Sequence, residues 1–165
     1  MGSNEAPLPS NIIVKYDSLK IPKTSKLSAI DSNIPIIDYF SEKYGLLKSL
    51  KTLATVGLSE ASPLVKPIWM LSKGQKYRAQ LADLILKESP IWLLDEFCAD
   101  LDPITASIIS SKLCKIVKDL GVIAIVAAAN NTHFYEVLKP TRVLLFDYGI
   151  EPKHLTIKEY KNELY

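Results

Sequence analysis

The chain has 165 residues, a formal net charge of +2, and hydrophobic and charged residues at 48% and 23%. A chain of this length forms one ordinary domain with a sizeable core, and this composition excludes a disordered protein. The nearly neutral charge gives no general argument for nucleic acid or for a membrane surface as a partner.

Two features predict a cytoplasmic location. The cysteines, Cys98 and Cys114, lie in separate segments without metal-ligand spacing, which indicates two free thiols in a reducing compartment. No amino-terminal signal is visible. The longest strongly apolar run, residues 122–129, is far shorter than the ~20 residues that span a bilayer.

Helices are predicted before residue 57, and irregular segments on either side of them. The stretches "IIDYFSEKY" and "LLKSLKTLATV" place apolar residues at three- and four-residue steps, with Gly45 between them and Gly57 after them. Residues 17–33 lack clear periodicity and predict an irregular connection. Residues 59–70 are interrupted by proline and predict another.

From residue 72 onward, helices and strands alternate. Ser72 and Gln75 have capping-box spacing at the start of a helix that continues towards Pro90. The stretch "IWLLD" is continuously apolar, as expected of a strand covered on both faces, so Leu93→Asp is expected to be severely destabilising. Asp102 precedes the next helix, and the stretches "VIAIVAAA" and "RVLLFDY" predict two more buried strands. This order predicts an α/β fold with a parallel sheet flanked by helices, and "TIKEYKNELY" predicts a polar helix at the end.

The turn "LSKGQ" has the properties of an anion site. At a helix start, free N–H groups and the positive end of the helix dipole favour a negative ligand, and Gly74 allows close approach to the backbone. The alternative is a capped helix that binds no ligand.

Two carboxylates, Asp95 and Glu96, follow the apolar stretch "IWLL". Ligands bind at the carboxyl ends of strands in open α/β sheets. Asp95 is therefore a candidate for holding Mg²⁺ through water, and Glu96 for polarising an attacking water. The alternative is a pair of solvated acids at a strand end. Asp102 is expected to cap the following helix, with any nucleotide-sensing role added to that structural one.

The order and spacing of "LSKGQ", "IWLLDE" and "ADLD" resemble the signature motif, Walker B with its following glutamate, and D-loop of ATP-binding-cassette ATPases. The resemblance covers roughly residues 34–149. It is closest to soluble archaeal cassette ATPases fused to an acetyltransferase-like domain, of which no acetyltransferase part is visible here. It implies part of a P-loop NTPase fold with a helical subdomain before the signature.

The resemblance also implies roles in a nucleotide-sandwich dimer. Asp95 would order Mg²⁺, Glu96 would be the catalytic carboxylate, and Asp102 would reach across the dimer interface. Three residues would contact the γ-phosphate of an ATP held by the opposite subunit: Ser72, Gly74 and Gln75. The implied partner is a P-loop-bearing protein or a longer copy of the same chain.

Two of the family's motifs are missing or ambiguous. Walker A requires Gly-Lys-Ser/Thr, and none of the six glycines is followed by lysine; no Q-loop glutamine is identifiable either. The switch histidine is His133, or its position is taken by Asn131 if the family pattern is anchored on residues 138–140. The chain is therefore expected to be inactive alone.

Four segments are predicted: a linker over 1–33, a helical subdomain over 34–70, the signature, Walker B and D-loop core over 71–150, and a tail helix over 151–165. The predicted function is a truncated ATPase domain that contributes these motifs to a shared ATP site. The alternative is a catalytically inactive subunit, or an interaction domain that binds no ATP.

Overall fold

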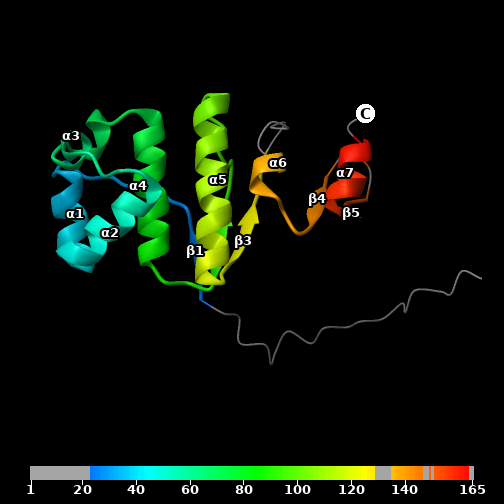
Figure 1. The fold of residues 1–165 in the computed structure, drawn as a ribbon, viewed down its shortest axis with the longest axis horizontal. Helices are drawn as coiled ribbons and strands as arrows, with labels where there is room; N and C mark the ends of the chain where they lie inside the picture. Colours follow the sequence, from blue (N-terminus) through cyan, green and yellow to red (C-terminus); the bar gives the residue numbers. More distant parts are fainter. Residues whose placement is uncertain (1–22, 129–134, 147–148, 150, 164–165) are drawn as a thin grey trace, which may run out of the picture.

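The computed structural model describes residues 23–128, 135–146, 149 and 151–163 (Figure 1). Its first half is helical: α1 (Ile36–Tyr44), α2 (Leu46–Val56), α3 (Ala61–Leu64), a 3₁₀ turn η2 (Ile68–Met70) and α4 (Lys73–Leu86). The two helices predicted around Gly45 are confirmed. The connection predicted over residues 59–70 is wrong in part, because it contains α3 and η2.

The chain contains a parallel sheet, as the sequence predicts. Its strands are β1 (Thr24–Lys26), β2 (Ile91–Leu94) and β3 (Ile123–Val126), in the order β1-β2-β3, and α5 (Pro103–Leu120) connects β2 to β3. In the register, Trp92 lies between Ser25 and Ala124. The α/β architecture is confirmed.

The irregular connection predicted over residues 17–33 is wrong where β1 lies. This strand is three residues long and carries no apolar pattern, so its own residues give no strand signal. Its place in the sheet comes from pairing with β2 and from a buried hydrogen bond of 2.5 Å between the Ser25 and Ser89 hydroxyls.

The strand predicted at "RVLLFDY" exists but does not join the parallel sheet. It is β4 (Val143–Leu145), which follows α6 (Tyr135–Leu138) and pairs antiparallel with β5 (Lys153–Leu155). The final helix, α7 (Ile157–Glu163), agrees with the helix predicted at "TIKEYKNELY", but a tail helix that begins at residue 151 is wrong, because residues 153–155 form β5. Among the described residues, no strand pairs with both β3 and β4, so these two strands belong to separate sheets.

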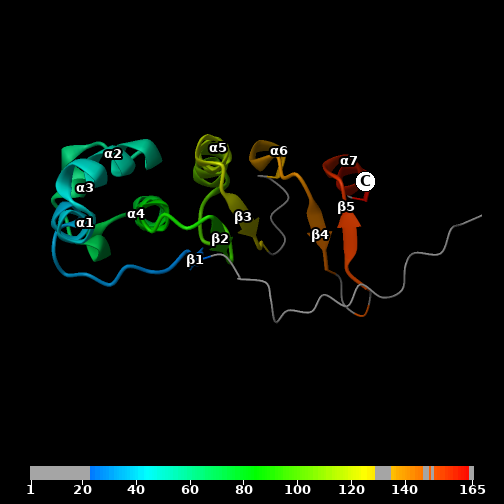
Figure 2. The same cartoon turned by 90° about the horizontal axis from the view of Figure 1, so that it is seen from below.

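Within the described residues, helices cover one face of the strand layer and not the other. Figure 2 shows α5, α6 and α7 on the same side of the strands. Trp92 and Leu94 of β2 are buried at 1% exposure, whereas Ile123 and Ile125 of β3 are 61% and 56% exposed. The expectation that the strands are covered on both faces is therefore wrong for β3, and Leu93 of β2 is only half-buried. None of the described helices is long and apolar enough to cross a bilayer.

Candidate functional site

The first turn of α4 is a complete capping box. The Ser72 hydroxyl accepts a hydrogen bond from the Gln75 backbone N–H at 3.2 Å, and the Gln75 side-chain oxygen accepts one from the Ser72 N–H at 3.0 Å. Ser72 is exposed and Gln75 half-buried. The box satisfies two N–H groups of this turn, so an anion here would meet the remaining free ones.

Gly74 lies where α4 approaches the start of α5. A Cβ atom added at Gly74 would lie 3.0 Å from the Thr105 side-chain methyl, so even alanine would crowd this contact. Helix packing alone therefore explains glycine at this position. The same contact fixes the distance between the beginnings of α4 and α5.

The turn after β2 presents its two carboxylates to solvent. The Asp95 carboxylate accepts a hydrogen bond from the Glu96 N–H at 3.1 Å and lies 3.5 Å from the Lys26 ammonium of β1. Glu96 has a φ of 47°, in the left-handed region that a non-glycine residue adopts at some cost. This conformation leaves Glu96 exposed while the next side chain, Phe97, is fully buried.

Tyr77 joins α4 to this turn. Its hydroxyl accepts a hydrogen bond from the Cys98 N–H at 3.4 Å, and its ring packs edge-on against Phe97 with centroids 5.9 Å apart. Burial raises the pKa of the Cys98 thiol to about 12, so this cysteine remains an unreactive thiol. The start of α4 and the turn after β2 therefore lie at the same end of the sheet.

Asp102 caps α5. Its carboxylate accepts a hydrogen bond from the Thr105 N–H at 2.9 Å, which confirms the predicted structural role. Hydrogen bonds from the Thr105 side chain and backbone hold the pKa of this exposed carboxyl below its ordinary value. Because Thr105 also contacts Gly74, the Asp102 cap and the first turn of α4 are neighbours.

The structure connects some predicted site residues and leaves others untested. Ser72, Gly74 and Gln75 share one turn, and Asp102 adjoins it through Thr105. The two candidates for the switch position, Asn131 and His133, lie outside the described residues.

Sequence reasoning missed the three residues that link the site elements. They are Tyr77, Thr105 and Lys26. Tyr77 carries a weak signal, because it follows Gly74 at helical spacing and therefore shares its face of α4. No local pattern points to Thr105 or Lys26.

An ion network around the buried Asp83 carboxylate of α4 connects this helix to the end of α1. Asp83 is 4% exposed, and its carboxylate contacts the ammonium groups of Lys43 at 2.9 Å and Lys87 at 2.8 Å. The Tyr44 hydroxyl donates a further hydrogen bond at 2.7 Å. Burial alone would raise the pKa of Asp83, but the hydrogen bonds from Lys87, Lys43 and Tyr44 outweigh it and hold the pKa below its usual range.

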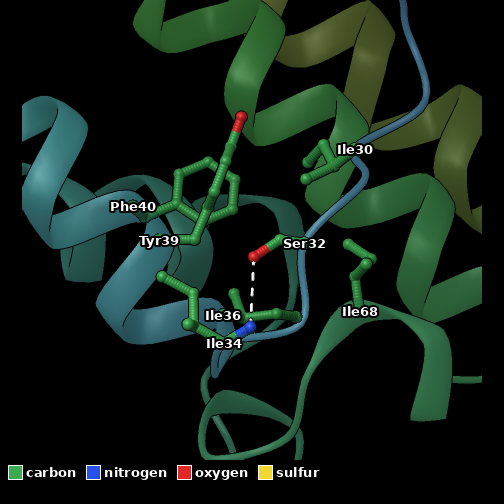
Figure 3. Close-up of a pocket in the computed structure, with 7 residues that line it drawn as sticks. All are labelled: Ile30, Ser32, Ile34, Ile36, Tyr39, Phe40 and Ile68. Carbon is green, nitrogen blue, oxygen red and sulfur yellow. Dashed lines mark hydrogen bonds between the residues drawn. The ribbon is translucent and has the colours of Figure 1, made fainter.

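Two surface depressions near α1 and α4 lie apart from this candidate site. Figure 3 shows the first, in which Ser32 accepts a hydrogen bond from the Ile34 N–H at 3.3 Å and apolar side chains leave no room for a ligand. The second is an open groove of about 480 Å³ whose lining includes Trp69 and Lys76. None of the predicted site residues lines either depression.

The described residues contain no group of three His, Cys, Asp or Glu side chains arranged to hold a metal. Mg²⁺ in nucleotide sites takes one or two carboxylates and completes its shell with water and phosphate oxygens. An exposed Asp95 fits that limited role.

No family model matches the chain, but curated proteins match part of it. It is 41% identical over 78 residues to the cytochrome c biogenesis ATP-binding export protein CcmA of Bartonella quintana, covering 46% of this chain and 35% of that protein. It is 37% identical over 76 residues to the phosphonates import ATP-binding protein PhnC of Staphylococcus aureus, covering 45% and 28%. Over these segments it is similar to ABC transporter ATP-binding proteins, and it spans about a third or less of their length.

Solved structures with a similar fold superimpose on most of the chain. Clostridium perfringens cbiO1, part of the ABC transporter complex cbiONQ, superimposes with a TM-score of 0.70 at 22% identity, covering 86% of this chain and 60% of that one. A chain of a metal-chelate type ABC transporter gives a TM-score of 0.66 at 17% identity, covering 84% and 60%. The chain therefore has the fold of ABC ATPase domains, over part of the length of such a domain.

Proposed function

We propose that the chain is part of an ABC-type ATPase domain, and that it supplies the signature motif, Walker B and D-loop to an ATP site completed by another polypeptide. The observation that carries this proposal is the meeting of three segments at one end of the sheet. The Ser72 turn, the Asp95–Glu96 turn and the Asp102 cap are tied together by the Tyr77–Cys98 and Gly74–Thr105 contacts.

The proposed roles follow the family pattern. Ser72, Gly74 and Gln75 contact the γ-phosphate of an ATP molecule held by the partner, and Asp95 orders Mg²⁺ through water. Glu96 is the catalytic carboxylate. Its side chain is exposed, and its backbone has a φ of 47° in a tight turn. Both features support a role in which the carboxylate contacts a water molecule and does not pack in the core.

In this proposal, the chain alone binds ATP with low affinity. Hydrogen bonds to charged groups contribute about 1.5–3 kcal/mol each, so the absence of four phosphate-loop contacts removes on the order of 6–12 kcal/mol. Micromolar binding amounts to only about 8 kcal/mol. The two or three contacts from the Ser72 turn become useful when a partner positions the nucleotide first.

The test is sedimentation of the chain with a P-loop-bearing partner or a longer copy of itself, with and without a non-hydrolysable ATP analogue. We expect association only with the analogue, and its loss in Ser72→Arg, which places a bulky cation over Gly74. Ser72→Ala is the matched control. It removes the same cap, at about 1 kcal/mol, without filling the space, so association should be weakened much less.

The alternative is a catalytically inactive subunit, or an interaction domain that binds no ATP. An inactive subunit still associates in the presence of the analogue, but the complex gives no hydrolysis that depends on Glu96. A plain interaction domain associates regardless of nucleotide and of the residue at position 72.

The names of the curated relatives favour a second candidate, the ATP-binding subunit of a transporter. In that case the chain binds a membrane subunit, and the groove beside Trp69 and Lys76 is a surface available for it. Co-purification with such a subunit from detergent, lost in Trp69→Glu, separates this candidate from an ATPase without a membrane partner. The cytoplasmic location and the kinship to the archaeal fused type remain predictions.

A further inference from the structure

Lys26 is the last residue of β1 and lies beside the turn that carries the two candidate carboxylates. Its backbone is held by the sheet, because Lys26 aligns with Leu93 and the Leu27 N–H donates to the Leu93 carbonyl at 2.9 Å. Aligned residues of neighbouring strands share a face, so the Lys26 side chain points to the face opposite Trp92. Its ammonium therefore extends from a fixed backbone position towards Asp95.

The two carboxylate oxygens of Asp95 have different neighbours. Oδ1 accepts the hydrogen bond from the Glu96 N–H at 3.1 Å, and Oδ2 lies 3.5 Å from the Lys26 ammonium. Because Oδ1 is occupied by a backbone donor, Oδ2 is the oxygen better placed to accept a hydrogen bond from a Mg²⁺-bound water. The metal role proposed for Asp95 and the ion pair with Lys26 therefore depend on the same atom.

The ion pair between Lys26 and Asp95 is loose. The two side chains are 61% and 62% exposed, and their separation of 3.5 Å is longer than the roughly 2.7–2.9 Å of a close charge-assisted hydrogen bond. Exposed pairs of this kind are screened by water and contribute little to stability. Lysine also carries its charge on a flexible four-carbon stem. The fold therefore gains little from this contact, and the ammonium can exchange one anionic partner for another.

We propose that Lys26 is a further nucleotide-contacting residue: it neutralises Asp95 while the site is empty, and it moves to a triphosphate oxygen when Mg²⁺–ATP is bound. In such a complex the metal is coordinated by phosphate oxygens and water, so a carboxylate that contacts a metal-bound water lies within roughly 6 Å of the triphosphate. Lysine binds phosphate groups as a mobile point charge. The ammonium that leaves Asp95 therefore has a more strongly charged partner within reach of its stem.

This inference rests on the proposed function and adds to it a residue that lies outside the signature, Walker B and D-loop motifs. It predicts effects of opposite sign on a free metal ion and on a metal–nucleotide complex. Towards a free divalent cation, Lys26 is a competitor for Asp95, so its removal should strengthen binding. Towards Mg²⁺–ATP, Lys26 is a ligand, so its removal should weaken binding. A residue that only supports the fold would change both affinities in the same direction or neither.

The experiment is a pair of NMR titrations of the full chain, carried into the millimolar range, that follow the Asp95 and Glu96 amide signals. The first probe is Mn²⁺ alone, which prefers the same oxygen ligands as Mg²⁺ and broadens nearby signals. The second probe is Mg²⁺–ATP, which shifts them. Lys26→Gln should strengthen Mn²⁺ binding by about two- to fivefold, as expected when an exposed ion pair is removed. It should weaken Mg²⁺–ATP binding by about threefold or more.

Two further variants separate a direct contact from a general effect of charge. Lys26→Arg keeps a cation at this position and should restore Mg²⁺–ATP binding to within about twofold of the original chain. Lys23→Gln removes the same charge from the exposed residue before β1, about 10 Å further from Asp95 along the strand, where salt screens it. Both affinities should stay within about twofold in this control. Circular dichroism checks that all variants remain folded.

Three results would overturn the inference. Unchanged affinities in Lys26→Gln would leave only a surface ion pair. Equal changes in Lys26→Gln and Lys23→Gln would identify a general effect of net charge. A lack of Mn²⁺ broadening at Asp95 in both the original chain and Lys26→Gln would show that this carboxylate meets no divalent cation. The proposed function is tested separately, by association that depends on the ATP analogue and on Ser72, so its failure is distinguishable from a failure at Lys26.

Discussion

The region from Ile36 to Ile116 and the region after it differ in how completely they are packed. The first holds every described residue of the buried apolar core, including Phe40, Leu53 and Phe97 at 0% exposure. After Ile116, no described residue is buried, although β3 and β4 are as apolar as β2. Apolar composition predicts that a strand should be covered, but it does not predict which residues supply the cover.

The strongest contrast is expected between two neighbours on β2. Leu94→Asp places an unpaired carboxylate at a site with 1% exposure and should cost more than about 4 kcal/mol, a large part of the stability of an ordinary domain. Leu93→Asp should cost clearly less, because Leu93 is half-buried on the open face. Urea denaturation of both variants measures the difference. Equal losses would mean that the open face is covered in solution.

A truncation pair compares the two regions directly. Leu113→Ala removes a side chain with 1% exposure on α5 and should cost about 3 kcal/mol. Ile125→Ala, at 56% exposure on β3, should cost less than about 0.5 kcal/mol. Thermal unfolding should show a drop of roughly 6–12 °C for the first and almost none for the second. A large drop for Ile125→Ala would contradict the uneven packing.

The Asp83 network should make a contribution to the stability of the packed region that is lost in acid. The folded pKa of Asp83 is below its ordinary value, so its charged form stabilises the fold above that value, and this contribution is lost as pH falls from about 4 through the folded pKa. Asp83→Asn should cost on the order of 1 kcal/mol at neutral pH, because the Lys43 and Lys87 side chains, at 44% and 28% exposure, can turn to solvent, and it should flatten the stability profile in this range. Stability curves from pH 7 to pH 2 for both proteins provide the check, and parallel curves would be the contrary result.

The smallest effect is expected at the exposed turn after β2. Glu96→Gln should change the free energy of unfolding by less than about 0.5 kcal/mol, because the side chain is exposed and no described contact holds it. Differential scanning calorimetry measures this. A loss above 1 kcal/mol would identify Glu96 as a structural partner instead of a catalytic candidate.

The parts of the fold that local sequence patterns determine were predictable. The capping box at Ser72 and the Asp102 cap are short-range patterns, and both helix starts are confirmed. β1 was missed because it depends on pairing with a strand more than sixty residues later in the chain. The partner of β4 was missed for the same reason, because β5 has little apolar pattern of its own.

The candidate site shows the same contrast between short-range patterns and long-range contacts. Its residue types could be identified in the sequence, but the contacts between its segments could not. Gly74 illustrates this, because its contact with Thr105 gives it a packing role that the phosphate hypothesis did not include.

The most direct test of the central claim, that this chain provides only the completing side of an ATP site, is a calorimetric titration of the purified chain with Mg·ATP. The account predicts no saturable binding in the micromolar range. The two or three hydrogen bonds proposed for the Ser72 turn give roughly 3–9 kcal/mol in total, and the loss of translational and rotational freedom on association costs about 4–15 kcal/mol. The Kd should therefore lie well above the micromolar range. Saturable micromolar binding at a stoichiometry of one would contradict it.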